Sequence, residues 1–209
     1  MEYETIAAAV DAEQEISRSR FLTRLERVSD EGAARSVIAR VRAEHPRARH
    51  HCSAFVLEPG ARVQRSNDDG EPSGTAGAPM LDALVSAGLS DVVAVVTRYF
   101  GGVLLGAGGL TRAYRSSVAE ATRLATRQRR GLRVGVAVTS AYDVAPQIEA
   151  EARRRGYALD GADYGERVTQ RYLLAENELR PFAALVAELS GGSAQPETGA
   201  AAFVDLPAA

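Results

Sequence analysis

The sequence contains no lysine, so every side chain that is cationic at neutral pH is an arginine, which we interpret as a compositional bias. Its single cysteine, Cys52, excludes an internal disulfide and gives no signal about the redox compartment. No apolar run approaches the roughly 18 residues that a membrane span needs. The N-terminal stretch MEYETIAAAVDAEQE is acidic and lacks the basic start of a signal peptide. These absences predict a soluble protein that is located in the cytoplasm and does not act at a membrane.

What the chain does contain predicts one or two ordinary globular units. Its 209 residues are 45% hydrophobic and 25% charged. Residues 1–131 hold 18 Arg against 16 Asp plus Glu, and residues 132–209 hold 7 against 11, so the two parts carry +2 and −4. Neither charge resembles the strongly basic footprint of a dedicated nucleic-acid binder. The arginines at 127–133 and 153–155 form either contacts to phosphate or acidic surfaces, or solvated helix ends.

Hydrophobic periodicity predicts alternating strands and helices in residues 1–131. Strand-like segments at 13–16 and 21–28 flank the polar SRSR and predict a hairpin, and an amphipathic helix follows from Ser29–Glu31 to His45. HCSAFVLEPG and ARVQRS predict two short strands. Pro79 is expected as the first residue of a helix that stops at Gly88. DVVAVVTRYF predicts a strand buried on both faces, and a long helix is expected from Leu110 to Leu124.

The basic segment RQRRG, residues 127–131, is interpreted as a linker. Beyond it the pattern predicts strand, helix, strand, strand, helix and strand, which is the ferredoxin-like βαββαβ order. About 78 residues suit that fold. The fold class we expect is therefore two-domain α+β, with the boundary near residue 131.

The stretch RYFGGVLLGAGGLTRAY, residues 98–114, places five glycines in nine residues between the buried strand and the long helix. Free N–H groups and the positive end of the dipole at a helix N-terminus attract phosphate or carboxylate, and glycine permits close approach. The spacing is neither that of a P-loop nor that of a dinucleotide fingerprint. An anion site and a tight turn packed on a neighbouring strand both remain open here.

The segment RSNDDGEPSGTAGAPM, residues 65–80, crowds Asp68, Asp69 and Glu71 into four residues. Carboxylates at this spacing could bind a divalent cation or supply a general base, although the order is not that of an EF-hand. A plain surface loop is the alternative, with Asp69 and Glu71 capping backbone N–H groups or pairing with Arg98 or Arg65.

The segment HPRARHHCSAF contains all three histidines of the chain. In a strand, His50 and Cys52 share one face and His51 and Ser53 share the other, so no ready metal site results. Cys52 and Ala54 are expected to face the core. Either His50 or His51 could contact a ligand or carry a proton, but no Ser-His-Asp order is visible.

Four motifs together closely resemble the IMPACT family, in its bacterial YigZ-like branch. They are SRSRF at 17–21, His50–Cys52, Ser66–Gly77, and Arg98–Gly102 with Leu105–Gly106, Gly108–Leu110 and Ala113–Tyr114. The resemblance covers residues 13–130, whereas residues 133–209 resemble the family's small second domain by strand order alone. Phe100 stands where tyrosine is also common, and arginine stands at positions often filled by lysine.

The resemblance implies that residues 1–131 form an IMPACT-type N-terminal domain, folded like the second domain of a small-subunit ribosomal protein. Residues 132–209 would form a ferredoxin-like domain similar to modules of elongation factors. Eukaryotic relatives act by binding a ribosome-associated protein, whereas bacterial relatives lack a settled biochemical role. The function we expect is a non-enzymatic binding protein linked to translation or its regulation, with RNA or a ribosome-associated protein as partner.

In this hypothesis a phosphate-bearing ligand lies in a glycine-rich cleft. No catalytic residue, metal ligand or cofactor is assigned. Tyr99, Phe100 and Tyr114 offer stacking surfaces. The alternatives are an enzyme that acts on a phosphorylated small molecule, with carboxylates and His51 in the chemistry, and a protein-interaction adaptor. The residues expected to bind the ligand are His51, Asp68, Asp69, Glu71, Ser73, Thr75, Arg98, Tyr99, Gly101, Gly102, Gly106, Gly108, Gly109, Arg112 and Tyr114.

Overall fold

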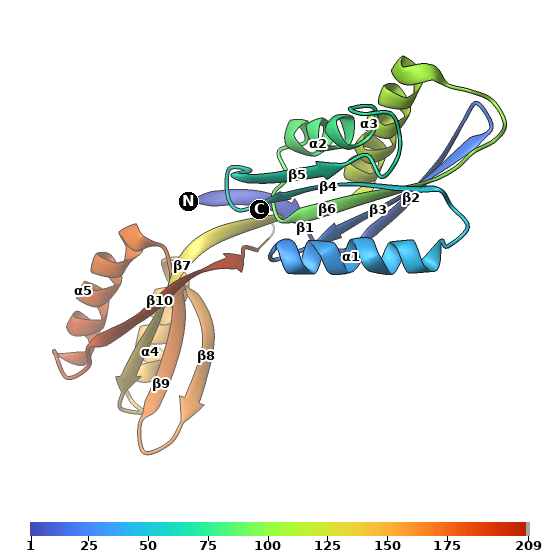
Figure 1. Ribbon diagram of the computed structural model, residues 1–209. Helices are drawn as coiled ribbons and strands as arrows, with labels where there is room; N and C mark the ends of the chain where they lie inside the picture. Colours follow the sequence, from blue (N-terminus) through green and yellow to red (C-terminus); the bar gives the residue numbers. More distant parts are fainter. Residues whose placement is uncertain (208–209) are drawn as a thin grey trace. The chain divides into compact units, whose positions relative to one another are not determined.

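The computed structural model describes residues 1–207 and confirms the α+β class (Figure 1). The chain divides into two compact units, residues 2–130 and residues 131–205, with Met1 grouped with the second unit and Leu206 with the first. We call them the first unit and the second unit.

The first unit is built on a five-stranded sheet in the order β2-β3-β6-β4-β5, with antiparallel neighbours throughout. Helix α1 lies on one face of the sheet, and α2 and α3 lie on the other (Figure 1). Its elements are β1 (Glu2–Ile6), β2 (Val10–Ile16), β3 (Ser19–Arg27), α1 (Glu31–Glu44), β4 (His50–Leu57), β5 (Val63–Asn67), α2 (Gly77–Ser86), β6 (Val92–Tyr99) and α3 (Gly106–Leu124).

Most of the predicted elements of this unit are confirmed. The hairpin is β2 and β3, and Asp30 caps α1 by accepting a hydrogen bond of 2.8 Å from the Ala33 N–H. Both helices on the other face begin earlier than predicted: α2 at Gly77 instead of Pro79, and α3 at Gly106 instead of Leu110. Glycine has a low helix propensity, so periodicity did not detect these first turns. Strand β1 was not predicted.

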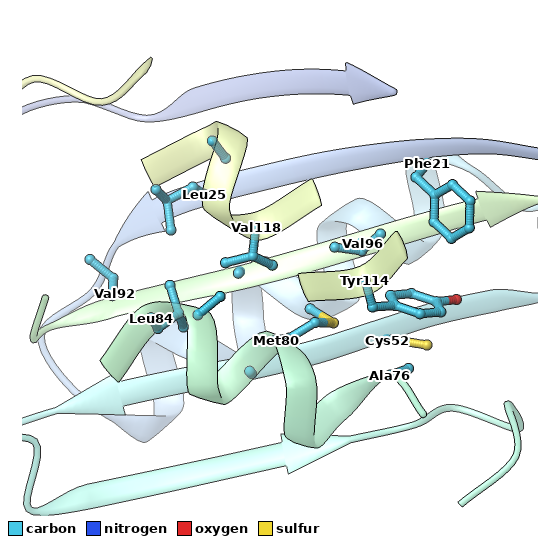
Figure 2. Close-up of a cluster of buried hydrophobic side chains, with 14 of the residues drawn as sticks. Phe21, Leu25, Cys52, Ala76, Met80, Leu84, Val92, Val96, Tyr114 and Val118 are labelled. Carbon is cyan, nitrogen blue, oxygen red and sulfur yellow. The ribbon is translucent and has the colours of Figure 1, made fainter. Parts of the chain in front are cut away.

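Strand β6 is buried on both faces, as its β-branched run predicts. On one side, Val96 of β6 and Cys52 of the neighbouring β4 pack against α2 and α3 in a cluster that includes Met80 and Tyr114 (Figure 2). The other side packs under α1 with Phe55. Because side chains alternate along a strand, β4 sends Cys52 and Ala54 into the first cluster, as predicted, and His51 and Ser53 to the α1 face.

The second unit has the predicted βαββαβ order. Strand β7, whose first residues 127–130 belong to the first unit, lies between β10 and β9, and β8 is next to β9. A separate core contains Val138, Ile148, Tyr172 and Phe182. The elements are β7 (Arg127–Ser140), α4 (Ala145–Arg154), β8 (Ala158–Tyr164), β9 (Val168–Leu174), the short 3-10 turn η1 (Glu176–Glu178), α5 (Leu179–Ser190) and β10 (Pro196–Asp205).

The predicted linker at residues 127–131 is wrong in conformation, because these residues are the first part of strand β7. Their arginines have carboxylate partners: Arg127 pairs with Glu4, and Arg129 pairs with Glu2. Both carboxylates belong to β1, the strand that the pattern did not reveal. The charged composition of residues 127–131 therefore suggested a solvated linker, whereas ion pairs with distant carboxylates accompany a strand there.

Gly101 is required by close packing. A Cβ at this position would lie 1.8 Å from the carbonyl oxygen of Arg18 in the β2–β3 turn, and the Gly101 N–H donates to Ser19 Oγ at 3.3 Å. The end of β6 thus packs directly against the hairpin. For this glycine, packing on a neighbouring segment explains the residue.

We expect Gly101→Ala to lower the free energy of unfolding by about 3 kcal/mol or more, because backbone must move to relieve the collision. Gly102→Ala is the matched control: Gly102 has φ +85° but open space around a Cβ, so only the left-handed backbone costs, about 1–2 kcal/mol. Urea unfolding followed by circular dichroism measures both. Equal losses in the two variants would contradict the packing account.

Candidate functional site

The acidic loop between β5 and α2 is closed by its own carboxylates. Asp68 accepts hydrogen bonds from the N–H groups of Gly74, Ala76 and Gly77 at 2.8–3.0 Å. Burial alone would raise the pKa of Asp68, but these three donors outweigh it and hold the pKa below its ordinary value. Asp68 therefore caps α2 through the loop, a role that its position nine residues before Gly77 does not reveal.

Asp69 joins the loop to α1 and β4. Its Oδ1 accepts from Arg42 at 2.7 Å, and its Oδ2 accepts from the His51 backbone N–H at 2.6 Å. Burial opposes ionisation, but these donors lower the pKa of Asp69 below its ordinary value. The structural alternative for Asp69 is thus confirmed in that it caps a backbone N–H, but its arginine partner is Arg42 and not Arg98 or Arg65.

Glu71 forms a buried ion pair with Arg98, which confirms the structural alternative for this residue. Glu71 Oε1 accepts from Arg98 Nη1 at 2.8 Å and from the Tyr114 hydroxyl at 2.7 Å. The side chains of Glu71 and Arg98 are 3% and 8% exposed. Burial, followed by its polar neighbours, raises the pKa of Tyr114 far above its usual range. Tyr114 is fully buried (Figure 2), so the expected stacking surface at this residue is wrong.

The remaining loop residues complete the closed structure. Thr75 is buried and donates its hydroxyl to the Pro72 carbonyl at 2.6 Å, whereas Ser73 is exposed at the surface of the loop. Within residues 1–207, no group of three or more His, Cys, Asp or Glu side chains is arranged to hold a metal ion. The carboxylate oxygens of the loop thus accept hydrogen bonds from N–H and O–H groups of the protein.

The glycine-rich turn ends in an open helix start. Gly106 and Gly108 are exposed at the first turn of α3, where no side chain caps the helix in the part of the chain that the structure describes. Gly102 and Gly106 have φ of +85° and +68° with open space around them, and Gly109 packs against Leu105. Arg112 is exposed, with Nη1 3.5 Å from a Cβ built on Gly108. The N–H groups of this turn are therefore available to an anion.

A pocket of about 580 Å³ lies where β6 ends and β4 begins. We call it the arginine–aromatic pocket. Its lining contains no carboxylate, and Arg98 forms part of it with a buried Nε that has no partner among the described residues. It is lined by Arg47, Ala48, Arg49, His50, Arg98, Tyr99, Phe100 and Leu104.

Exposed groups surround this buried guanidinium. Arg47 and Arg49 are exposed, and neither has an ion pair or side-chain hydrogen bond within residues 1–207. Phe100 is 55% exposed and Leu104 is 88% exposed. The Arg98 guanidinium lies between Phe21 and Phe100, 5.6 Å from each ring centroid. The pocket therefore offers free positive charge beside an accessible aromatic ring.

The structure brings some predicted site residues to this pocket and separates others. Arg98 and Tyr99 line it, while His51 lies on the opposite face of β4 under α1. Arg47 and Arg49 were missing from the expected set, and His50 was named only as an alternative to His51. The signal for them was present in HPRARHH, where two arginines directly precede the strand, but only the pairing of β4 with β6 places them beside Phe100.

Other arginine clusters are paired within the chain. Arg153 pairs with Glu149, and Arg154 and Arg155 both pair with Glu151. These pairs favour the interpretation of this run as a solvated helix end. Arg47 and Arg49 differ from these arginines because they have no such ion pairs, so their charges are available to a ligand.

Comparison with known proteins relates the chain to one family. Residues 17–122 match the model of the Impact N-terminal domain. The chain is 39% identical over 204 residues to the IMPACT family member YvyE of Bacillus subtilis (strain 168), covering 97% of this chain and 94% of the relative. It is 40% identical over 191 residues to the IMPACT family member YigZ of Escherichia coli (strain K12), covering 90% and 94%.

Among solved structures, a crystal structure of a hypothetical protein is 39% identical, with a TM-score of 0.64. The match covers 93% of this chain and 96% of that chain. Within residues 1–207, none of the helices combines the length and the apolar character that a bilayer crossing requires.

We expect Glu71→Ala to lower the free energy of unfolding by about 3–5 kcal/mol, because it leaves the Arg98 charge buried without a partner. The matched control is Glu13→Ala, which breaks the exposed pair between Glu13 and Arg20 and should have a much smaller effect. Urea unfolding at neutral pH measures both variants. Similar losses would show that burial does not govern the Glu71 pair.

The acidic loop should also determine acid sensitivity. The folded-state pKa of Asp68 and Asp69 is lowered, so their contribution to stability is complete above the unfolded value of about 3.9 and is lost as the pH falls through the folded value. We expect Asp68→Asn to be less stable than the native chain at neutral pH and to lose less on acidification from about pH 5 to about pH 2. Urea titrations at a series of pH values test this, and parallel profiles would contradict it.

Proposed function

Because the chain belongs to the IMPACT family, we propose that it is a non-enzymatic binding protein that serves translation or its regulation. In this proposal residues 1–131 form the ligand-binding domain and residues 132–209 form a ferredoxin-like domain. The ligand is RNA, bound through its phosphates. A cytoplasmic location is part of the proposal, because translation takes place there.

The observation that carries the proposal is the arginine–aromatic pocket. Arg47 and Arg49 present two unpaired guanidinium groups, and Arg98 adds a third charge that Glu71 balances. Arginine binds phosphate through a planar fork of donors. An exposed ring such as Phe100 stacks on an unpaired base whatever its sequence. Single-stranded RNA supplies both a phosphate and an unpaired base, whereas a free phosphate ion supplies only the first.

The open start of α3 supplies a second place for phosphate in the same proposal. Its exposed glycine N–H groups lie at the end of the turn that begins with Phe100 and includes Leu104, and Arg112 adds a free charge beside them. Gly102, Gly106 and Gly108 would thus act through the backbone, while Glu71 and Tyr114 hold Arg98 before the turn. Asp68, Asp69, Ser73 and Thr75 belong to the acidic loop and have no direct part in RNA binding here. His51 has no part in RNA binding here.

The overall charge predicts modest affinity. The formal net charge is −2, and residues 1–131 carry only +2. A ligand held by a few arginines without a basic surface around them binds weakly and dissociates as salt rises. This favours a recognition role at a local site over coating of long RNA.

An enzyme that acts on a phosphorylated small molecule is the second candidate. The observation in its favour is that Asp69 Oδ2 lies 3.7 Å from His51 Nδ1. Against it, Asp68, Asp69 and Glu71 each accept at least two hydrogen bonds from the protein, so no carboxylate is free to act as a base in this arrangement. The protein-interaction adaptor remains the third candidate, supported by exposed Leu104.

We expect a fluorescein-labelled single-stranded RNA of about 12 nucleotides to bind at low salt in fluorescence anisotropy, with a slope against salt that reflects few phosphates. Arg47→Ala and Arg49→Ala should each weaken binding about fivefold to tenfold, and the double variant should reduce the log–log salt slope by about 1.4. Arg112→Ala should weaken binding as well.

Arg180→Ala is the matched control. Arg180 is an exposed arginine of the second unit, and its substitution removes the same charge away from the pocket. If the control weakens binding as much as Arg47→Ala does, or if no RNA binds at low salt, the proposal is wrong. Binding of a ribosome-associated protein through Leu104, unchanged by Arg47→Ala, would support the adaptor instead.

A further inference from the structure

A second pocket, of about 400 Å³, lies on the opposite face of the sheet between α1 and the edge strand β5. We call it the α1–β5 pocket. It exists because α1 packs on β6 and β4 and leaves the outer part of the sheet uncovered. Its volume is that of a small-molecule site. The lining residues are Arg35, Ile38, Ala39, Arg42, His51, Ser53, Phe55, Arg65, Ser66 and Asn67.

The lining combines positive charge with an apolar floor. Arg35, Arg42 and Arg65 contribute three cations, of which Arg35 is paired with Glu31, and no carboxylate lies among the lining residues. Arg42 is held by Asp69 at 2.7 Å, whereas the Arg65 guanidinium donates only to the Gln64 carbonyl among the described residues. Ile38 and Phe55 supply the apolar part. Such a lining fits an oxyanion that has an apolar body.

A buried orphan nitrogen provides an independent sign of a ligand. His51 is 3% exposed, and its Nε2 lies 3.1 Å from the His45 carbonyl, which requires Nε2 to donate. Nδ1 is then the free ring nitrogen, and it has no hydrogen-bond partner among the described residues. Asp69 Oδ2 is 3.7 Å away, too far for a hydrogen bond. Buried polar atoms in proteins normally have a partner.

We propose that the α1–β5 pocket binds a small organic oxyanion, a phosphomonoester or carboxylate with an apolar body. The oxyanion is held by Arg65 at the rim, the body lies on Ile38 and Phe55, and His51 Nδ1 makes a hydrogen bond with the bound molecule. This site is independent of the arginine–aromatic pocket, because His51 and His50 lie on opposite faces of β4.

The charges around His51 fit this role. Arg42 faces it from α1, Asp69 from the acidic loop, and His45 from the chain after α1. Burial is the main cause that lowers the pKa of His51, which favours the neutral ring. A bound oxyanion gives Nδ1 a partner in either of two ways: a protonated ligand oxygen donates to it, or the ring takes up a proton and donates. Both change the 15N resonance of Nδ1.

Titration of the full chain with phenyl phosphate, followed by NMR of the histidine ring nitrogens and backbone amides, tests the proposal. We expect saturable shifts at His51 Nδ1 and at the amides of Ser53 and Asn67. Inorganic phosphate, which lacks the body, and benzyl alcohol, which lacks the charge, should each bind more weakly than phenyl phosphate. Equal binding of benzyl alcohol would overturn the oxyanion assignment.

Arg65→Ala should raise the dissociation constant for phenyl phosphate about tenfold, the loss expected for one charge-assisted contact, and Arg65→Lys should restore part of the affinity. The matched control is Arg62→Ala, which removes an exposed arginine directly before β5 that pairs with Glu58 and is outside the lining. Equal effects of Arg62→Ala and Arg65→Ala would overturn the proposal.

The two sites are distinguished in the same samples. Arg47→Ala should leave phenyl phosphate binding unchanged, and Arg65→Ala should leave RNA binding unchanged. Loss of RNA binding alone would contradict only the proposed function. Absence of saturable shifts at His51, or displacement of phenyl phosphate by RNA, would overturn the small-molecule site.

Discussion

The buried ion pair between Arg98 and Glu71 is the interaction on which the candidate site depends. It joins the end of β6 to the acidic loop, and the Tyr114 hydroxyl adds α3 to the same oxygen. An arginine buried without Glu71 would be an uncompensated charge. With it, the guanidinium can lie between Phe21 and Phe100 and still form part of a pocket. The pair therefore fixes the position of the end of β6, after which the exposed ring of Phe100 and the glycine turn follow.

The three carboxylates that suggested metal binding or acid–base chemistry instead order the loop. Asp68 satisfies the N–H groups that precede and begin α2, Asp69 connects α1 to β4, and Glu71 neutralises Arg98. Each has its negative charge matched by donors on a different element. The result is a surface from which the acidic charge is withdrawn and on which arginines remain free. That distribution favours a ligand with negative charge.

The alternation of β4 gives the unit two different faces. His50 belongs to the arginine–aromatic pocket, and its neighbour His51 belongs to the α1–β5 pocket. One strand thus separates a site with an exposed aromatic ring from a site with a buried, unpartnered imidazole. A phosphate-rich chain fits the first arrangement, and a compact molecule with an apolar part fits the second.

The sequence by itself determined the hairpin, α1, the doubly buried strand, the βαββαβ order of the second unit and the IMPACT family. Local periodicity, capping at Asp30 and long motifs carry this information within short windows of the chain. It also located the open glycine turn. Tertiary structure alone decided that residues 127–131 extend a strand, that Asp69 pairs with Arg42, that Tyr114 is buried, and that Arg47 and Arg49 lie beside Phe100. These are contacts between segments distant in the sequence, and strand pairing and burial, which no local pattern encodes, determine which partners meet.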